Sequence, residues 1–159
     1  MRVLRRFLAL WAGFFAASVV AGTVVKLMVR SEDDQSAPRF SLVTVFDSAE
    51  FRPTTRDLIA SRALTMFGGT RIDLRRAATT GTDPIRLDLI TVMGGTDITV
   101  PDSWKVTVQG VAVAGGHDIH VADHGSLPAD APHLAIHART VMGGVRVQAR
   151  PVLQSADLG

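Results

Sequence analysis

The chain repeats one short pattern four times, and this repetition constrains its fold more than any other feature of the sequence. Each copy is an apolar run that meets a pair of glycines and is followed by a second apolar run with strict alternation. Copies of one pattern separated by a few tens of residues are typical of solenoids, in which each copy adds one coil. The four copies are RALTMFGGTRIDL (62–74), LITVMGGTDITV (89–100), GVAVAGGHDIHV (110–121) and ARTVMGGVRVQA (138–149).

Alternating apolar residues before each glycine pair predict a strand with one buried face. Closer to the glycines, at Ile90 and Val92 for example, the apolar positions shift by one residue. A shift of one residue turns the buried face outward unless the chain bends. We therefore expect three short strands per copy, separated by two corners. Glycine suits a corner because it adopts positive φ and allows another backbone to approach; the corner glycines are Gly68, Gly69, Gly94, Gly95, Gly115, Gly116, Gly143 and Gly144.

These features predict an all-β fold: a short right-handed parallel β-solenoid of about four to five coils with Gly-Gly corners, preceded by one transmembrane α-helix. A degenerate fifth copy at 42–53, with Asp47 and Ser48 in place of the glycines, would form a terminal coil. A β-sandwich also uses short alternating strands and is the competing fold. The regular columns of the repeat favour the solenoid.

One outward column of the repeat carries charge. The third residue after the first glycine is Arg71, Asp97, Asp118 or Arg146 in the four copies. If the coils stack in chain order, Arg71 faces Asp97 and Asp118 faces Arg146. The Asp97–Asp118 neighbours would then repel each other, which counts against strict stacking in that order.

The amino-terminal segment contains 19 residues without a charge, from Phe7 to Val25. As a helix this run would be about 28 Å long, close to the hydrocarbon thickness of a bilayer. We expect an uncleaved membrane anchor, although a cleaved signal peptide is the alternative. Small residues recur every fourth position at Gly13, Ala17 and Ala21, a pattern that permits helix dimerisation and is also common in membrane helices generally.

The anchor defines the expected organisation of the chain. Basic residues flank the run on both sides, and their balance leans towards a domain outside the cytoplasm. We predict four segments: an anchor at 1–30, a polar tether at 31–39, a β-solenoid domain at 40–152 and a tail at 153–159.

Composition excludes several classes of function. The chain is 47% hydrophobic and has no cysteine, so disulfides and cysteine-based sites are impossible. Five of the 17 basic side chains lie in residues 1 to 30, so 12 basic side chains face 15 acidic ones in the rest, a net charge of −3. A nucleic-acid-binding surface requires the opposite balance.

Candidate chemistry in the sequence is weak. Five histidines cluster at 117, 120, 124, 133 and 137, but strand geometry places His117 and His120 on opposite faces and His133 about 13 Å from His137. We therefore expect no metal, no cofactor and no catalysis, since Asp97, Asp102 and Asp118 occupy outward or turn positions. Trp104 is a possible partner contact, or else it closes the coil interior at a corner. The longest loop, 122–133, is a plain insertion or a binding loop.

Segments such as FGGTRIDLRRA, VPDSWKV and LAIHARTVMGGVRVQ resemble the LiaF-like carboxy-terminal domain, the cell-wall-active antibiotic response family, over roughly residues 40 to 150. The resemblance implies a membrane protein connected with envelope stress, and the family's namesake restrains a two-component histidine kinase. We expect a non-enzymatic single-pass protein of the cell membrane, whose domain binds a protein partner such as a two-component sensor. The alternative is a structural or oligomer-forming scaffold at the membrane.

Overall fold

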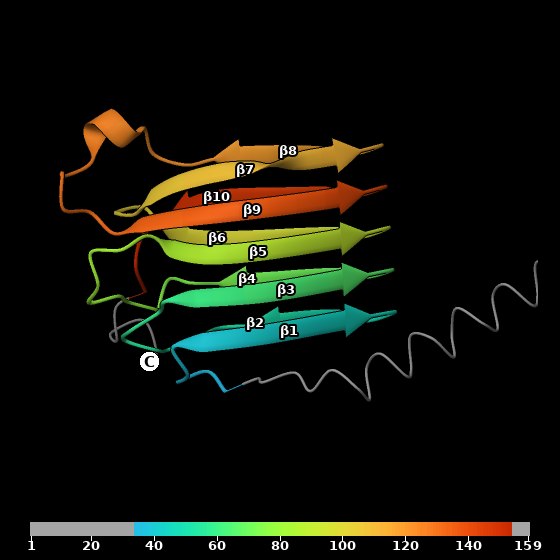
Figure 1. Ribbon diagram of the computed structural model, residues 1–159, viewed down its shortest axis with the longest axis horizontal. Helices are drawn as coiled ribbons and strands as arrows, with labels where there is room; N and C mark the ends of the chain where they lie inside the picture. Colours follow the sequence, from blue (N-terminus) through green and yellow to red (C-terminus); the bar gives the residue numbers. More distant parts are fainter. Residues whose placement is uncertain (1–33, 154–159) are drawn as a thin grey trace, which may run out of the picture. The chain divides into compact units, whose positions relative to one another are not determined.

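A computed structural model describes residues 34–153, and this part of the chain is all-β (Figure 1). The predicted anchor at 1–30 lies outside the described residues, as does nearly all of the predicted tail. Within the described part, no helix has the length and apolar character needed to cross a bilayer. One short 3-10 helix, η1 (His124–Ser126), lies in the long loop.

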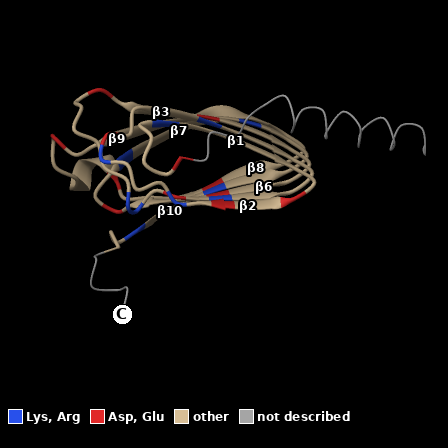
Figure 2. Cartoon of the chain, turned by 90° about the horizontal axis from the view of Figure 1, so that it is seen from below, with Lys and Arg blue, Asp and Glu red and all other residues tan. Residues whose placement is uncertain are grey.

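Ten strands form two five-stranded sheets, which Figure 2 shows as two layers joined at one edge by tight turns. Long strands build the first sheet, and shorter strands build the second. The first sheet contains β1 (Arg39–Val45), β3 (Ala60–Met66), β5 (Ile85–Val92), β9 (His133–Val141) and β7 (Lys105–Val113), in that spatial order. The second contains β2 (Ser48–Phe51), β4 (Gly69–Asp73), β6 (Gly95–Pro101), β10 (Gly144–Arg150) and β8 (Gly116–His120).

Each copy of the repeat forms one coil, which consists of a long strand, a tight turn and a short strand. Neighbouring coils pair in parallel and in register throughout both sheets, so the predicted all-β fold with parallel sheets is confirmed. The degenerate copy at 42–53 contributes β1 and β2, which form the first coil. Parallel pairing between neighbouring coils is unlike the antiparallel hairpins of the competing sandwich.

The coils do not stack in chain order. The last coil, β9 and β10, lies between the third coil (β5, β6) and the fourth (β7, β8). This order agrees with the Asp97–Asp118 repulsion that counted against stacking in chain order. The loop between β8 and β9 carries the chain back, so that the fourth coil forms one end of the stack and the first coil the other.

The expectation of three strands per copy is wrong. Alternation continues without a shift up to the turn, and the inward positions nearest the turn are filled by buried threonines: Thr44, Thr65, Thr91 and Thr140. Their hydroxyls bond across the core to the second sheet, with Thr65 Oγ1 2.6 Å from Thr70 Oγ1 and Thr91 Oγ1 2.9 Å from Thr96 Oγ1. A buried hydroxyl with a partner is tolerated inside a protein. The apolar residues assigned inward, such as Ile90, instead point outward.

Positive φ falls on the residue before the glycines, not on the glycines themselves. The described glycines all avoid positive φ, whereas the residue that precedes the corner pair has φ between 51° and 53° in every coil. This conformation lets each turn bond to both neighbours. The amide of Met93 donates to the carbonyl of Val141 at 2.8 Å, and the amide of Gly95 donates to the carbonyl of Gly68 at 3.0 Å.

The first glycine of each pair is required by close approach. A Cβ atom at Gly94 would lie 2.2 Å from the carbonyl oxygen of Gly68, whereas a Cβ at Gly95 would meet nothing within 4 Å. Gly68 faces Asp47 in the same way. In the first coil the equivalent direction at Asp47 points out of the stack, which explains why this corner needs no glycine.

The hydrophobic core lies between the two sheets, and its rows follow the coils. Isoleucine, leucine and valine from both sheets are almost completely buried in the second, third and fifth coils, for example Ile72, Leu89, Ile98, Ile136 and Val147. At the first coil, Phe40 and Phe51 close the core with their rings 4.7 Å apart.

Candidate interaction surface

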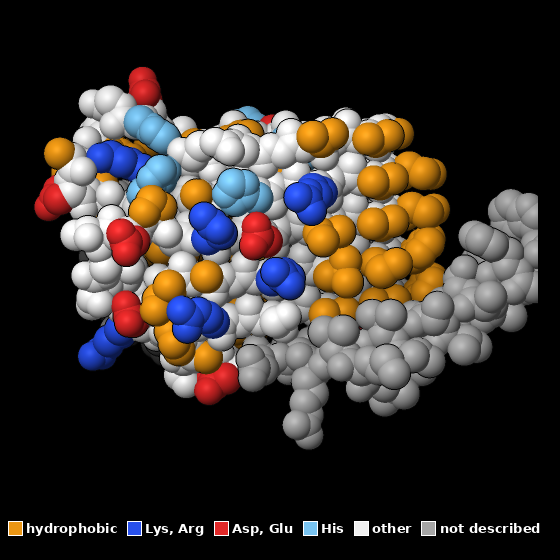
Figure 3. Space-filling model, in the orientation of Figure 1, with side chains coloured by type: hydrophobic (Ala, Val, Ile, Leu, Met, Phe, Trp, Pro, Cys, Tyr) orange, Lys and Arg blue, Asp and Glu red, His pale blue; other side chains and the backbone are white. Residues whose placement is uncertain are grey.

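An exposed apolar surface runs along the turn edge of the stack and onto the outer face of the first sheet. We call this surface the apolar band; its exposed members are Phe46, Phe67, Ile90, Met93, Val111, Val113, Val141 and Met142, and its half-buried members are Leu64, Met66 and Val92. Figure 3 shows the apolar side chains in rows at the turn end of the molecule. Among the described residues, eight of the eleven exposed large apolar side chains belong to the band, so their exposure is clustered.

Two sequence features build the band. Strand residues two and four positions before the first glycine alternate with the buried threonines, so they face outward. The positive-φ residue then places a further apolar side chain at the tip of each turn, and in the first two coils Phe46 stacks on Phe67 at 4.8 Å. Near the turn, the long strands thus place threonines inward and mostly apolar side chains outward.

A basic strip borders the band on the outer face of the first sheet. Arg62, Arg86 and Arg139 line an open hollow there together with Asp88 and His137. Figure 3 shows basic, acidic and histidine side chains beside the apolar rows on this face. The strip therefore carries more positive than negative charge.

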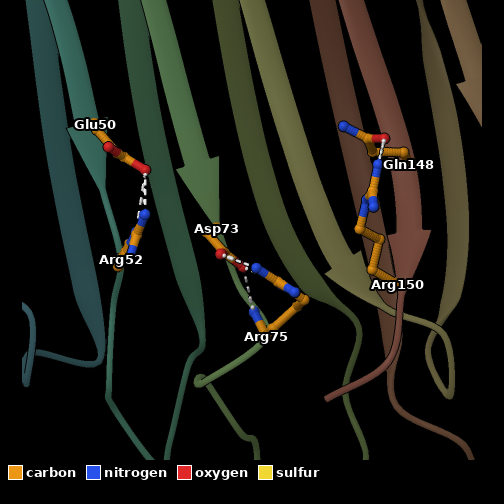
Figure 4. A network of polar contacts seen from close by, with 6 residues as sticks. All are labelled: Glu50, Arg52, Asp73, Arg75, Gln148 and Arg150. Carbon is orange, nitrogen blue, oxygen red and sulfur yellow. Dashed lines mark hydrogen bonds and ion pairs between the residues drawn. The ribbon is translucent and has the colours of Figure 1, made fainter. Parts of the chain in front are cut away.

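The outer face of the second sheet has a different character, because its charges are balanced. Arginines at the ends of three strands fold back onto the side chain two residues earlier: Arg52 on Glu50, Arg75 on Asp73 and Arg150 on Gln148 (Figure 4). Burial raises the pKa of Asp73, but hydrogen bonds from Arg75 and its charge outweigh this effect and hold the pKa below 3.8.

The fourth coil leaves the core open at its end of the stack. Ile119 in β8 occupies an inward position but is 43% exposed, whereas Val147, its register partner in the neighbouring coil, is 0% exposed. Of the described strands, β7 pairs with β9 alone and β8 pairs with β10 alone. His124 of the long loop contacts the carbonyl of Val106, with a 2.8 Å separation between Nε2 and the oxygen, so the loop lies against the start of β7.

The structure places the remaining candidate residues in structural or surface roles. The Trp104 side chain lies in the core at 5% exposure, as its alternative interpretation expected, and leaves almost no indole surface for a partner. His117 approaches Thr140 at 3.4 Å, and His133 approaches Thr107 at 2.9 Å. Within residues 34–153, no group of three or more histidine, aspartate or glutamate side chains is arranged to hold a metal ion. Asp97 and Asp118 lie on the outer face of the second sheet, and Asp102 is exposed after β6.

Sequence reasoning missed the apolar band. The signal was present as the apparent shift of phase before each glycine pair, at positions such as Leu64, Ile90 and Val111. That shift was assigned to a bend in the backbone. It marks instead a change in the outer face from polar to apolar.

Comparisons with known proteins gave no relative: no protein-family model, no curated protein and no solved structure matches this chain.

Proposed function

We propose that this chain is a single-pass membrane protein whose right-handed β-solenoid binds a protein partner and thereby modulates a cell-envelope stress response, without catalysis. Support for the membrane anchor comes from the uncharged run at 7–25, and support for the stress response comes from the resemblance noted in the sequence. We favour partner binding over catalysis because the prominent features of residues 34–153 are the exposed apolar band and the open end of the stack. The charged side chains that meet there, such as Asp73 and Arg75, pair with each other on the strands.

The open end of the stack is the observation that carries this proposal. There the interior apolar column reaches solvent at Ile119, while β7 and β8 each present one unpaired strand edge. An extended segment of a partner that added a strand beside β7 would satisfy this edge and cover the exposed column. A membrane-bound sensor of a two-component system is the partner that we propose.

The alternative function is a structural scaffold in which the same end receives a second copy. A twofold axis normal to the sheets would pair β7 with β7 and β8 with β8, antiparallel, and bury Ile119 of both copies. The first coil does not offer an equivalent end, because Phe40 and Phe51 close the core there and the Cβ of Asp47 points outward. This alternative therefore favours a closed dimer over a filament.

Sedimentation of the full chain in detergent separates these two functions. A modulator that keeps its open end for a partner should sediment as one small species at every concentration, whereas a scaffold should shift to larger species as its concentration rises. Ile119→Lys would abolish such a shift if the open end forms the contact.

The test in cells uses two matched substitutions and a transcriptional reporter of envelope stress. Ile119→Lys places a charge at the open end, and Ile59→Lys places one at a residue of nearly equal exposure, 42%, elsewhere on the domain. We expect only Ile119→Lys to change the reporter output, with both variants accumulating to the level of the parent chain. An unchanged output with both variants would contradict partner binding at this end.

We also propose that the domain lies outside the cytoplasm. A tag at Gly159 should then be removed by protease added to intact spheroplasts. Protection of the tag until lysis would place the domain inside and would direct the search to cytoplasmic partners.

A further inference from the structure

The turn tips carry bulky apolar side chains in a backbone conformation that such residues rarely adopt. Phe46, Phe67, Met93 and Met142 have φ of 51° to 53°. For residues with a Cβ this left-handed region costs about 1–2 kcal/mol, and glycine or asparagine would occupy it more readily. A turn that needed only this backbone shape would use those residues. The repeated choice of phenylalanine and methionine therefore indicates that the side chains themselves have a role.

These turn tips form one edge of the apolar band, and the band is large enough to be a contact surface. With strands about 4.8 Å apart, five coils extend the apolar band over roughly 19 Å, and the four residues from Ile90 to Met93 extend it over roughly 10 Å in the other direction. A single exposed apolar residue is ordinary, but a contiguous patch of this kind marks a contact surface.

Charge beside the band distinguishes between possible occupants. Arg139 interrupts the apolar column that contains Ile90 and Val111, and Arg62 and Arg86 lie farther along the same outer face, where Asp88 is the acidic neighbour. A second copy docked through this face would bring two basic strips together. An anionic lipid surface would instead attract them, since apolar residues bordered by arginine match the boundary between acyl chains and headgroups.

We propose that the apolar band lies on the surface of an anionic bilayer, with the turn tips at the acyl boundary and Arg62, Arg86 and Arg139 among the headgroups. This inference rests in part on the membrane anchor of the proposed function. Residues 34 to 38 form a turn in which the carbonyl of Gln35 accepts from the amide of Thr54. Residues 26 to 33 therefore separate the uncharged run from the folded domain, and an extended segment of eight residues reaches roughly 26 Å. The β1 strand runs for seven residues from Arg39 towards the turn edge, about 20 Å, so the tether is long enough for the tips to return to the bilayer.

The test uses the full chain reconstituted into vesicles and one fluorescent label at a time. Because the chain has no cysteine, a single substitution gives a unique labelling site. Met93→Cys places a bimane at a turn tip, Met142→Cys repeats the test in another coil, and His120→Cys is the control on the outer face of the second sheet, where the histidine side chain is 71% exposed. The vesicles contain phosphatidylcholine and phosphatidylglycerol, with or without lipids brominated along the acyl chain.

We expect bromolipids to quench the label at positions 93 and 142 and to leave the label at 120 unquenched. Replacing phosphatidylglycerol with phosphatidylcholine should lower the quenching at 93. Each substitution Arg62→Gln, Arg86→Gln or Arg139→Gln should reduce the ratio of docked to undocked domain about fivefold, because a basic residue near an anionic surface contributes about 1 kcal/mol.

A label at 93 and 142 that stays unquenched in inserted, folded protein would overturn the proposal. The proposal would also be overturned if the label were unquenched in vesicles but buried in cells, because this result would assign the band to a protein partner. Failure here is distinguishable from failure of the proposed function: Ile119→Lys should leave the quenching at 93 unchanged, whereas the arginine substitutions should leave the sedimentation behaviour unchanged.

Discussion

Arg146 lies between Asp97 and Asp118, with its Nε 3.1 Å from Oδ2 of Asp118 and its Nη1 3.9 Å from Oδ1 of Asp97. The register of the second sheet extends this column to Arg71 and Glu50, so the charges alternate over all five coils. Figure 2 shows acidic and basic residues side by side across this sheet. Insertion of the last coil between the third and the fourth therefore separates two aspartates that chain order would place together.

Reversal of the central charge should destabilise the domain. Arg146→Asp would place three carboxylates on adjacent strands in place of two attractive pairs. Exposed cross-strand pairs contribute roughly 0.2–1 kcal/mol each, so we expect a loss of about 1–2 kcal/mol in the free energy of unfolding. Urea unfolding at low and high salt measures the loss, which should shrink at high salt because the charges are exposed.

The matched control reverses the whole set of three charges. Asp97→Arg and Asp118→Arg, combined with Arg146→Asp, restore alternation among these three residues and should recover part of the lost stability. A triple variant less stable than Arg146→Asp alone would show that the column does not act through charge.

Engineered disulfides would test the order of the coils directly. Cysteines at 97 and 146 occupy neighbouring strands, about 4.8 Å apart, whereas cysteines at 97 and 118 lie two strands apart, about 9.6 Å. A disulfide requires Cα atoms within about 7 Å. We expect oxidation to cross-link the first pair readily and the second pair poorly, as measured by gel mobility without reductant. Ready cross-linking of 97 with 118 and poor cross-linking of 97 with 146 would indicate that the coils stack in chain order.

The parallel all-β fold could be predicted from the sequence because every copy of the repeat has apolar residues at largely the same positions. The order of the coils and the residues of the outer face could not be predicted. Coil order depends on where the 122–133 loop carries the chain, and the local pattern of β9 is the same in either place. The outer face was misassigned because threonine fills inward positions at Thr65, Thr91 and Thr140, where only apolar residues were expected. The side chains that bond to these threonine hydroxyls lie on the other sheet, so no local sequence pattern reveals them.

The two glycines of a corner should respond differently to the same substitution. Gly94→Ala places a Cβ against the carbonyl of Gly68 and should destabilise the domain by about 1–3 kcal/mol or more, since backbone must move to relieve the overlap. Gly95→Ala meets open space and should change stability by less than about 0.5 kcal/mol. Urea unfolding of both variants, followed by circular dichroism, checks the difference. Equal losses would mean that close approach does not explain the corner.

Protonation of Asp73 in acid should lower the free energy of unfolding of the domain. Its pKa in the folded chain is lower than its ordinary value of 3.8, so its contribution is fully present above that value and is lost as the pH falls through the lower, folded pKa. Asp73→Asn should destabilise the domain by about 1–3 kcal/mol at neutral pH, because the Arg75 guanidinium loses its carboxylate partner beside a buried side chain. The variant should also lose less stability than the parent chain below pH 3.8.

Glu50→Gln is the matched control for this acid effect. Glu50 also pairs with the arginine two residues later, Arg52, at 2.7 Å, but both side chains are about half exposed, so the pair contributes between about 0 and 1 kcal/mol. Unfolding by urea at a series of acidic pH values compares the two variants. If Asp73→Asn kept the full acid sensitivity of the parent chain, the Asp73–Arg75 pair would not be the origin of that sensitivity.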